Sequence, residues 1–152
     1  MPRLHETIDT ALPLEAAFAF VADFANASRW DPGVATSERI DDGPVGVGAR
    51  YRLGIRNRGR VTPMEYQVSA FEPARRVVLS GRGSGIDAVD EICFEPGADG
   101  TGTHIDYTAD IQLLGWMRLV QPFVGGTFDR IAKDALGGMQ RSLDALAAER
   151  QP

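Results

Sequence analysis

Apolar and polar residues alternate along four segments in the middle of the chain, and glycine-containing turns separate these segments. A period of two residues is typical of strands that have one buried face and one exposed face. Such strands predict an antiparallel sheet with one wet side and one covered side. The predicted inward faces are Ala49, Tyr51, Leu53 and Ile55; Met64, Tyr66, Val68 and Ala70; Ile86, Ala88, Asp90, Ile92 and Phe94; and Ile105, Tyr107, Ala109, Ile111 and Leu113.

Helical patterns lie on the N-terminal side of these strands. After a first predicted strand at Leu4–Thr10, Pro13 is placed to open a helix, because proline is well suited to the start of a helix. A second short helix is predicted over Phe24–Trp30, ended by the turn residues that follow Trp30. The apolar residues of the first helix recur at helical spacing and are Leu14, Ala17, Phe18, Val21 and Ala22.

The C-terminal segment carries one apolar stripe that predicts a helix of several turns. Helical geometry places Gly138 on the same face as this stripe and Gly137 toward solvent. The whole pattern predicts an α+β fold in which a curved antiparallel sheet wraps around a long C-terminal helix. One helix leaves part of the concave side unfilled, which allows an internal cavity. The stripe consists of Phe128, Ile131, Ala135, Met139, Leu143 and Leu146.

Short motifs along nearly the whole chain resemble the START-like SRPBCC superfamily, which has the helix-grip fold and includes polyketide cyclase/dehydrase-like proteins. The resemblance implies one domain over residues 1–152 and a hydrophobic ligand (polyketide-, aromatic- or lipid-like) in an internal cavity. It leaves catalysis open, because fold does not determine function. The motifs are Pro13–Phe18, Val21–Asp23, Trp30–Val34, Phe71–Pro73, Phe94–Pro96 and Gly102-Thr103.

All three tyrosines of the chain fall on predicted inward faces. A buried phenol needs a partner for its hydroxyl, so three of them in one enclosure indicate a cavity with polar points. The alternative is that their hydroxyls reach solvent at the rim of the sheet. With neighbouring inward residues, the predicted ligand-binding set is Trp30, Tyr51, Met64, Tyr66, Tyr107, Phe128, Ile131, Ala135, Gly138 and Met139.

Asp90 is the one charged residue on an otherwise apolar inward face. Burial would raise the pKa of its carboxyl and make it a candidate for proton transfer. The alternative is a strand irregularity that turns Asp90 outward beside Glu91.

The composition of the chain excludes several classes of protein function and of structural site. The chain has 152 residues with a net charge of −5, which lacks the electrostatic footprint of a nucleic-acid binder. Cys93 is the only cysteine, so an internal disulfide and a cysteine-rich zinc site are both excluded. We expect no metal and no cofactor. The chain shows no signal peptide and no apolar stretch near the ~20 residues that span a bilayer, so the expected location is cytoplasmic.

Three further segments have ordinary explanations. Gly81–Ile86 lacks the spacing of a phosphate-binding loop and is expected to form a hairpin turn. Leu113–Val120 is expected to connect the last strand to the long helix by packing on the core, with a surface patch as the alternative. The arginines between Arg50 and Arg60 are expected to pair with the acidic residues between Asp87 and Asp110 across adjacent strands.

The leading functional hypothesis is therefore a protein that binds a hydrophobic small molecule and has either cyclase/dehydrase activity or none. The first alternative is a non-catalytic carrier or sensor for a lipid or an isoprenoid. The second alternative is an interaction module that has no ligand.

Overall fold

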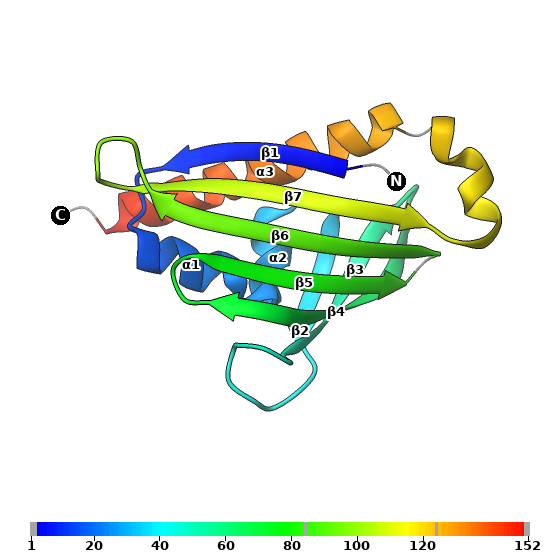
Figure 1. The fold of residues 1–152 in the computed structure, drawn as a ribbon, viewed down its shortest axis with the longest axis horizontal. Helices are drawn as coiled ribbons and strands as arrows, with labels where there is room; N and C mark the ends of the chain where they lie inside the picture. The colour runs from blue at the N-terminus through cyan, green and yellow to red at the C-terminus, as the bar shows by residue number, and fades with distance from the viewer. Residues whose placement is uncertain (1–2, 84, 124, 151–152) are drawn as a thin grey trace.

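The structure, a computed structural model, describes residues 3–83, 85–123 and 125–150, without the side chains of 120–125. The described strands form a seven-stranded antiparallel sheet in the order β1-β7-β6-β5-β4-β3-β2 (Figure 1). Their bounds are β1 Arg3–Thr10, β2 Val34–Arg39, β3 Arg50–Asn57, β4 Arg60–Glu72, β5 Arg76–Gly83, β6 Ile86–Pro96 and β7 Thr103–Leu113.

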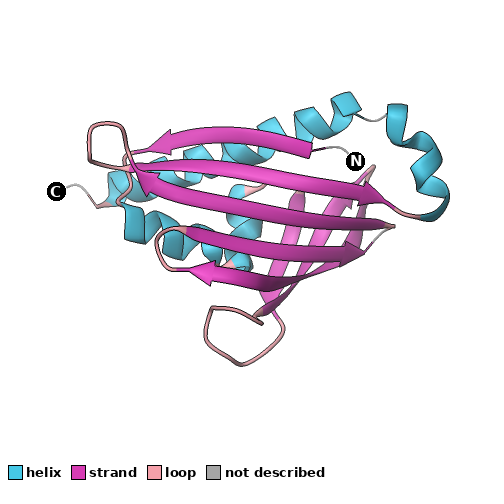
Figure 2. Cartoon of the chain, in the orientation of Figure 1, coloured by secondary structure: helices cyan, strands magenta, loops and turns pink. Residues whose placement is uncertain are grey.

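The sheet curls, and the helices lie on its concave side (Figures 1 and 2). The long helix α3 (Gly125–Glu149) runs behind β1 and β7, and α1 (Leu14–Ala22) and α2 (Ala27–Trp30) lie beside it. A short 3-10 helix, η1 (Phe24–Asn26), joins α1 to α2. The helix-grip architecture predicted from the sequence is therefore confirmed. No helix among the described residues is both long enough and apolar enough to cross a membrane.

The start of α1 follows from Pro13, whose carbonyl accepts the first helical hydrogen bond from Ala17 N at 2.9 Å. The helix buries its apolar face in the concave side of the sheet. Phe18 makes edge-to-face contacts with Phe71 and Phe94, at ring-centroid distances of 5.2 and 5.0 Å. Asp23 then ends α1 and caps η1 by accepting a hydrogen bond from Ala25 N.

The apolar stripe of α3 is buried only in its C-terminal part. Ala135, Met139 and Leu143 are buried as predicted, but Ile131 is 49% exposed and Phe128 only partly buried. The prediction for Ile131 was wrong because α3 packs mainly on β1 and α2, while its first turns run past them toward a second 3-10 helix. Periodicity identifies which face of a helix is apolar, but it does not show how far along the helix the packing partners extend.

Gly138 is buried as predicted, but it does not border open space. A Cβ atom at this position would lie 2.1 Å from the Trp30 carbonyl oxygen and 3.0 Å from Pro32 Cδ. The glycine thus lets α3 approach the backbone that joins α2 to β2. At Gly137 the nearest atom to a Cβ would be Arg141 Nη1 at 3.4 Å, the tip of a flexible side chain.

Ion pairs line the outer face of the sheet, but with partners other than those predicted. Strand order separates β3 from the acidic strands β6 and β7, so Arg52 of β3 pairs with Glu65 of β4 and Glu38 of β2. The acidic strands find arginines on β5 and β1 instead. The pairs there are Arg76–Glu91, Arg82–Asp87 and Arg3–Asp110.

The predicted connection Leu113–Val120 packs on the core only at its start, where Leu113 is buried; most of the rest lies in a second 3-10 helix, η2 (Gly115–Phe123), and the Val120 side chain is outside the described residues. Trp116 is 73% exposed and Leu119 is 78% exposed, so the surface alternative describes these two side chains. The start of η2 is held by the β5–β6 hairpin, where Leu114 N donates to the Gly85 carbonyl at 2.8 Å. The predicted hairpin is thus present, although its residue Ser84 lies outside the described residues.

Candidate functional site

Strand β6 places the Asp90 side chain inside the molecule. It pairs with β5 and β7 in an unbroken register, so its alternation is preserved at Asp90. The residue is 7% exposed, among apolar neighbours such as Leu79 and Ile92. The alternative in which a strand irregularity turns Asp90 outward is therefore excluded.

Asp90 is hydrogen-bonded to Tyr107, which lies diagonally across from it on β7. The Tyr107 hydroxyl donates to Asp90 Oδ2, while Oδ1 receives no hydrogen bond from the described residues. Burial raises the pKa of Asp90 to about 6; the hydrogen bond from Tyr107 works against this rise and the nearby Asp31 adds to it. A carboxyl with a pKa near neutrality can both accept and return a proton under physiological conditions.

Asp31 is a second carboxyl of this region, which sequence reasoning treated only as a turn residue. Its Oδ1 does serve the turn, because it accepts a hydrogen bond from Gly33 N at 2.8 Å. Burial raises the pKa of Asp31, the Gly33 hydrogen bond lowers it, and Asp134 on α3 raises it further. Asp31 also acts on Asp90 and on the two nearest tyrosines. Its position directly after Trp30 is the one sequence signal that could have placed it here.

A group of aromatic rings in mutual contact reaches Asp90 through Tyr107. Phe24 is in the centre, with ring centroids 5.4 Å from Tyr66 and 6.1 Å from Trp30. Trp30 in turn meets Tyr107 in an edge-to-face contact at 6.3 Å. Trp30 is 3% exposed, and its indole Nε1 has no hydrogen-bond partner among the described residues. Buried donors are seldom left unpaired, so this nitrogen calls for an explanation.

Tyr66 lies over Gly81 on the neighbouring strand. A Cβ on Gly81 would come within 2.4 Å of the Tyr66 ring, so the glycine provides the space that the ring occupies. Burial raises the pKa of Tyr66 well above its usual value, and the carboxylates of Asp90 and Asp31 raise it further. Burial acts in the same direction on Tyr107. Both phenols therefore stay protonated, and the Tyr107 hydroxyl donates to Asp90.

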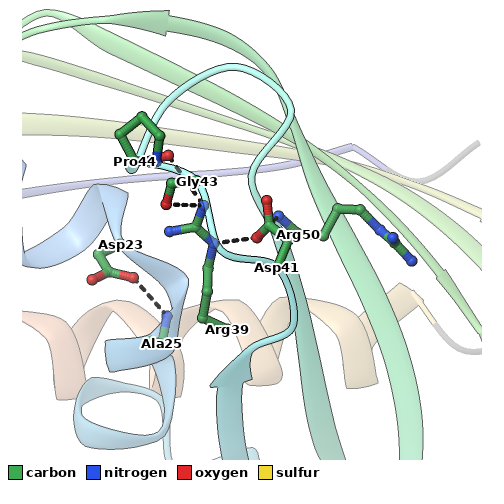
Figure 3. Close-up of polar contacts among 7 residues, drawn as sticks. All are labelled: Asp23, Ala25, Arg39, Asp41, Gly43, Pro44 and Arg50. Carbon is green, nitrogen blue, oxygen red and sulfur yellow. Dashed lines mark hydrogen bonds and ion pairs between the residues drawn. The ribbon is translucent and has the colours of Figure 1, made fainter.

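Tyr51 lies at the other end of the aromatic group, beside a cation. The Arg39 guanidinium is 5.5 Å from the Tyr51 ring centroid; it donates to Asp41 and to the carbonyl oxygens of Gly43 and Pro44 (Figure 3). Burial raises the pKa of Tyr51 to about 12, and Asp23 is near enough to contribute. The Tyr51 hydroxyl is buried and makes no hydrogen bond of good geometry with the described residues.

The structure brings together part of the predicted ligand-binding set. Trp30, Tyr66, Tyr107 and the candidate catalytic Asp90 form one connected group, and Tyr51 joins it through Phe24. The tyrosine hydroxyls were alternatively expected at the sheet rim; the Tyr107–Asp90 hydrogen bond excludes this for Tyr107. Of the remaining predicted residues, Met64, Ala135 and Met139 are buried, Gly138 faces the Trp30 backbone, and Phe128 and Ile131 lie on the outlying turns of α3.

Two hollows of the surface are lined by residues other than Asp90. One, of about 750 Å³, lies over β3–β6 between the Arg50–Glu65 and Arg82–Asp87 side chains, and Tyr66 also lines it. The other, of about 550 Å³, lies between α1 and the end of α3, next to Phe20 and Leu146. Among the described residues, no three His, Cys, Asp or Glu side chains are grouped as metal ligands would be.

The family described as "Polyketide cyclase / dehydrase and lipid transport" matches residues 1–150 of the chain. The chain belongs to this family. No curated protein matches it in sequence.

Solved structures resemble this member of the polyketide cyclase/dehydrase and lipid transport family over its full length. A START superfamily protein from Mycobacterium smegmatis is 15% identical, with a TM-score of 0.73 over 99% of this chain and 100% of that one. The Zhui aromatase/cyclase from Streptomyces sp. R1128 is 14% identical, with a TM-score of 0.76 over 97% and 94%. The di-domain aromatase/cyclase BexL is 14% identical, with a TM-score of 0.74 over 95% of this chain and 47% of that one. At these identities the likeness establishes the fold.

Proposed function

We propose that this chain binds a hydrophobic small molecule between the concave face of the sheet and α3, next to Asp90. The observation that supports this most is the Asp90–Tyr107 pair, in which the buried Asp90 carboxyl has a partly buried tyrosine as its partner and no cation beside it among the described residues. A carboxyl buried in this way lowers the stability of the folded state, and proteins retain such groups mainly where function requires them. Family membership points to the same class of ligand.

Entry of a ligand requires the side chains around Asp90 to move. Met64 and Met139, both buried, are suited to this because an unbranched thioether side chain adapts to different shapes. Met64 lies on β4 close to Gly83 at the β5–β6 hairpin, and Met139 lies on α3. The pocket would thus be adaptable on two sides and polar at Asp90 and Tyr107.

We further propose that the protein is an enzyme of the cyclase/dehydrase type, with Asp90 as the proton-transfer group. The Asp90 carboxylate would take a proton from the carbon next to a substrate carbonyl. In a dehydration the carboxylic acid would return this proton to the leaving hydroxyl, which departs as water; in a cyclisation it would return it to the alkoxide that forms when the new carbon–carbon bond closes on a second carbonyl. Tyr107 holds the carboxylate in place by its hydrogen bond to Oδ2 and leaves Oδ1 for the substrate. The aromatic rings around it would orient a flat substrate.

Binding is tested by titration with the neutral fluorescent probe N-phenyl-1-naphthylamine. We expect saturable binding that is weakened at least about tenfold in Tyr66→Trp, because the larger ring would fill the space beside Asp90. Gln67→Trp is the control, since Gln67 is the exposed neighbour on the same strand. Equal probe affinity in both variants would refute this location.

Catalysis is tested on the molecule that native mass spectrometry finds bound to protein purified from its host. The wild type should convert this molecule or its precursor, and Asp90→Asn should bind it without converting it. Unchanged conversion by Asp90→Asn would remove the proposed role of Asp90 and favour the non-catalytic carrier.

A further inference from the structure

The charged groups that act on the interior around Asp90 are all acidic. The charge that acts on Asp90 is Asp31, beside the hydrogen bond from the neutral Tyr107 phenol, and the charge that acts on Asp31 is Asp134. Asp90 and Asp31 are the charges that act on Tyr66. No Lys, Arg or His of the described residues is among these groups. Arg39, the cation near Tyr51, is already bound to Asp41 and to two loop carbonyls.

Near Asp90, two acceptor oxygens and one donor N–H make no hydrogen bond with the described residues. Asp90 Oδ1 can accept, and so can the Asp31 oxygen that is not used by Gly33 N. Trp30 Nε1 can only donate, and it is buried without a partner. The Trp30 ring is in contact with the Tyr107 ring, whose hydroxyl binds Asp90, so the free donor and the Asp90 acceptor belong to one group of contacting side chains.

We propose that the polar head of the ligand is an uncharged hydroxyl, an alcohol or a phenol on an apolar skeleton, and that the interior rejects carboxylates. A hydroxyl donates one hydrogen bond and accepts others, so it can serve both an aspartate oxygen and the indole N–H. A carboxylate could accept from the indole N–H, but it cannot donate to an aspartate oxygen. It would also lie beside two carboxyls of its own sign, with no cation among the described residues to balance the charge. This inference rests on the proposed function, because it concerns the ligand of the same site.

An ammonium head meets only part of this requirement. It would be attracted to Asp90 and Asp31 and to the aromatic rings around them. It has no acceptor for Trp30 Nε1, however, so the buried donor would stay unpaired at a cost comparable to a lost hydrogen bond. A hydroxyl head can accept a hydrogen bond from this donor. We therefore propose a hydroxyl and not an ammonium group as the head of the ligand.

The test compares four probes that share one skeleton and differ only in the head group: naphthalene, 2-naphthol, 2-naphthoate and 2-naphthylmethylammonium. Affinities for the wild type are measured by isothermal titration calorimetry at pH 7.5. We expect 2-naphthol to bind most tightly, about tenfold or more above naphthalene, because it adds a hydrogen bond to a buried charged group. We expect 2-naphthoate to bind most weakly.

Two pairs of variants locate the effect. Asp90→Asn should raise the affinity for 2-naphthoate at least about tenfold, because the amide removes a charge and adds a donor. Its control is Asp87→Asn, three positions earlier on the same strand but paired with Arg82 outside. Trp30→Phe should weaken 2-naphthol several-fold and leave naphthalene unchanged, whereas Trp116→Phe, at the 73% exposed tryptophan, should change neither.

The outcomes separate this inference from the proposed function. Binding of 2-naphthoate as tight as that of 2-naphthol overturns the inference, as does tightest binding of the ammonium probe or equal binding of 2-naphthol and naphthalene. Any of these results would still be consistent with a hydrophobic binding site, but with a different preference for the head group. Failure of all four probes and of N-phenyl-1-naphthylamine to bind would instead overturn the proposed function itself.

Discussion

The two faces of strand β6 carry the same kind of side chain in opposite settings. On the outer face, Asp87 and Glu91 lie 3.1 and 2.7 Å from Arg82 and Arg76, and each pair is partly exposed to solvent. On the inner face, Asp90 is buried with a tyrosine hydroxyl as its partner and with no cation among the described residues. Outside, the charges are balanced locally; inside, they are not.

This difference separates structural from functional carboxylates. Exposed ion pairs add little to stability and can be exchanged at small cost. A buried carboxyl without a cation destabilises the folded state whenever it is ionised, so chance and folding alone do not favour it. A buried carboxyl without a cation, opposite a face of paired charges, therefore marks a candidate functional residue that motif spacing alone does not identify.

The largest effect is expected on α3, where Gly138 faces inward and Gly137 outward. Gly138→Leu should destabilise the fold by about 3 kcal/mol or more, because the new side chain would meet the Trp30 carbonyl oxygen. Gly137→Leu should stabilise it by up to ~1 kcal/mol, since it replaces a helical glycine next to a flexible arginine tip. Urea denaturation of both variants measures the difference. Similar stabilities would show that α3 does not approach α2 as closely as described here.

A smaller effect is expected from Asp90→Asn, and its sign depends on pH. Because burial raises the pKa of Asp90 from 3.8 to about 6, the folded state holds its proton more tightly than the unfolded chain does. Stability contributed by the protonated form is therefore lost as the pH rises from about 4 to 6, by up to about 3 kcal/mol. The asparagine variant should be more stable than wild type at pH 8 by about 1–3 kcal/mol and equal to it near pH 4.

Asp87→Asn is the control for this measurement. It removes one exposed ion pair, so its stability should differ from that of wild type by less than about 1 kcal/mol at pH 8. Urea denaturation at both pH values compares the three proteins. If Asp90→Asn were less stable than wild type at pH 8, Asp90 would be a structural carboxylate like those of the outer face.

How far the sequence predicts these features depends on the range of the interaction. Alternation is local, so it correctly placed Asp90 and the three tyrosines on the inner face. The partners of Arg52 depend on strand order, which alternation does not contain. Ile131 was misjudged because a helical stripe shows which face of the helix is apolar but not how far the surface opposite it extends, whereas Gly138 lies on the buried face as predicted. Asp31 looks like any aspartate in a turn until the fold brings β6 and β7 beside it.

The smallest effect concerns His104, an ion-pair partner on the outer face. His104 Nδ1 lies 2.8 Å from Asp9 Oδ1 across β1 and β7, and this hydrogen bond raises the pKa of His104. The charged histidine binds the carboxylate better in the folded state, so its stabilising contribution is complete below pH 6.5 and is lost as the pH rises through the folded-state pKa. His104→Gln should therefore lower stability at pH 5.5 by less than about 1 kcal/mol and have no effect at pH 9. Urea denaturation at the two pH values measures this. A loss as large as the change produced by Asp90→Asn would mean that outer-face charges matter as much as the buried carboxyl, which would break the contrast between the two faces.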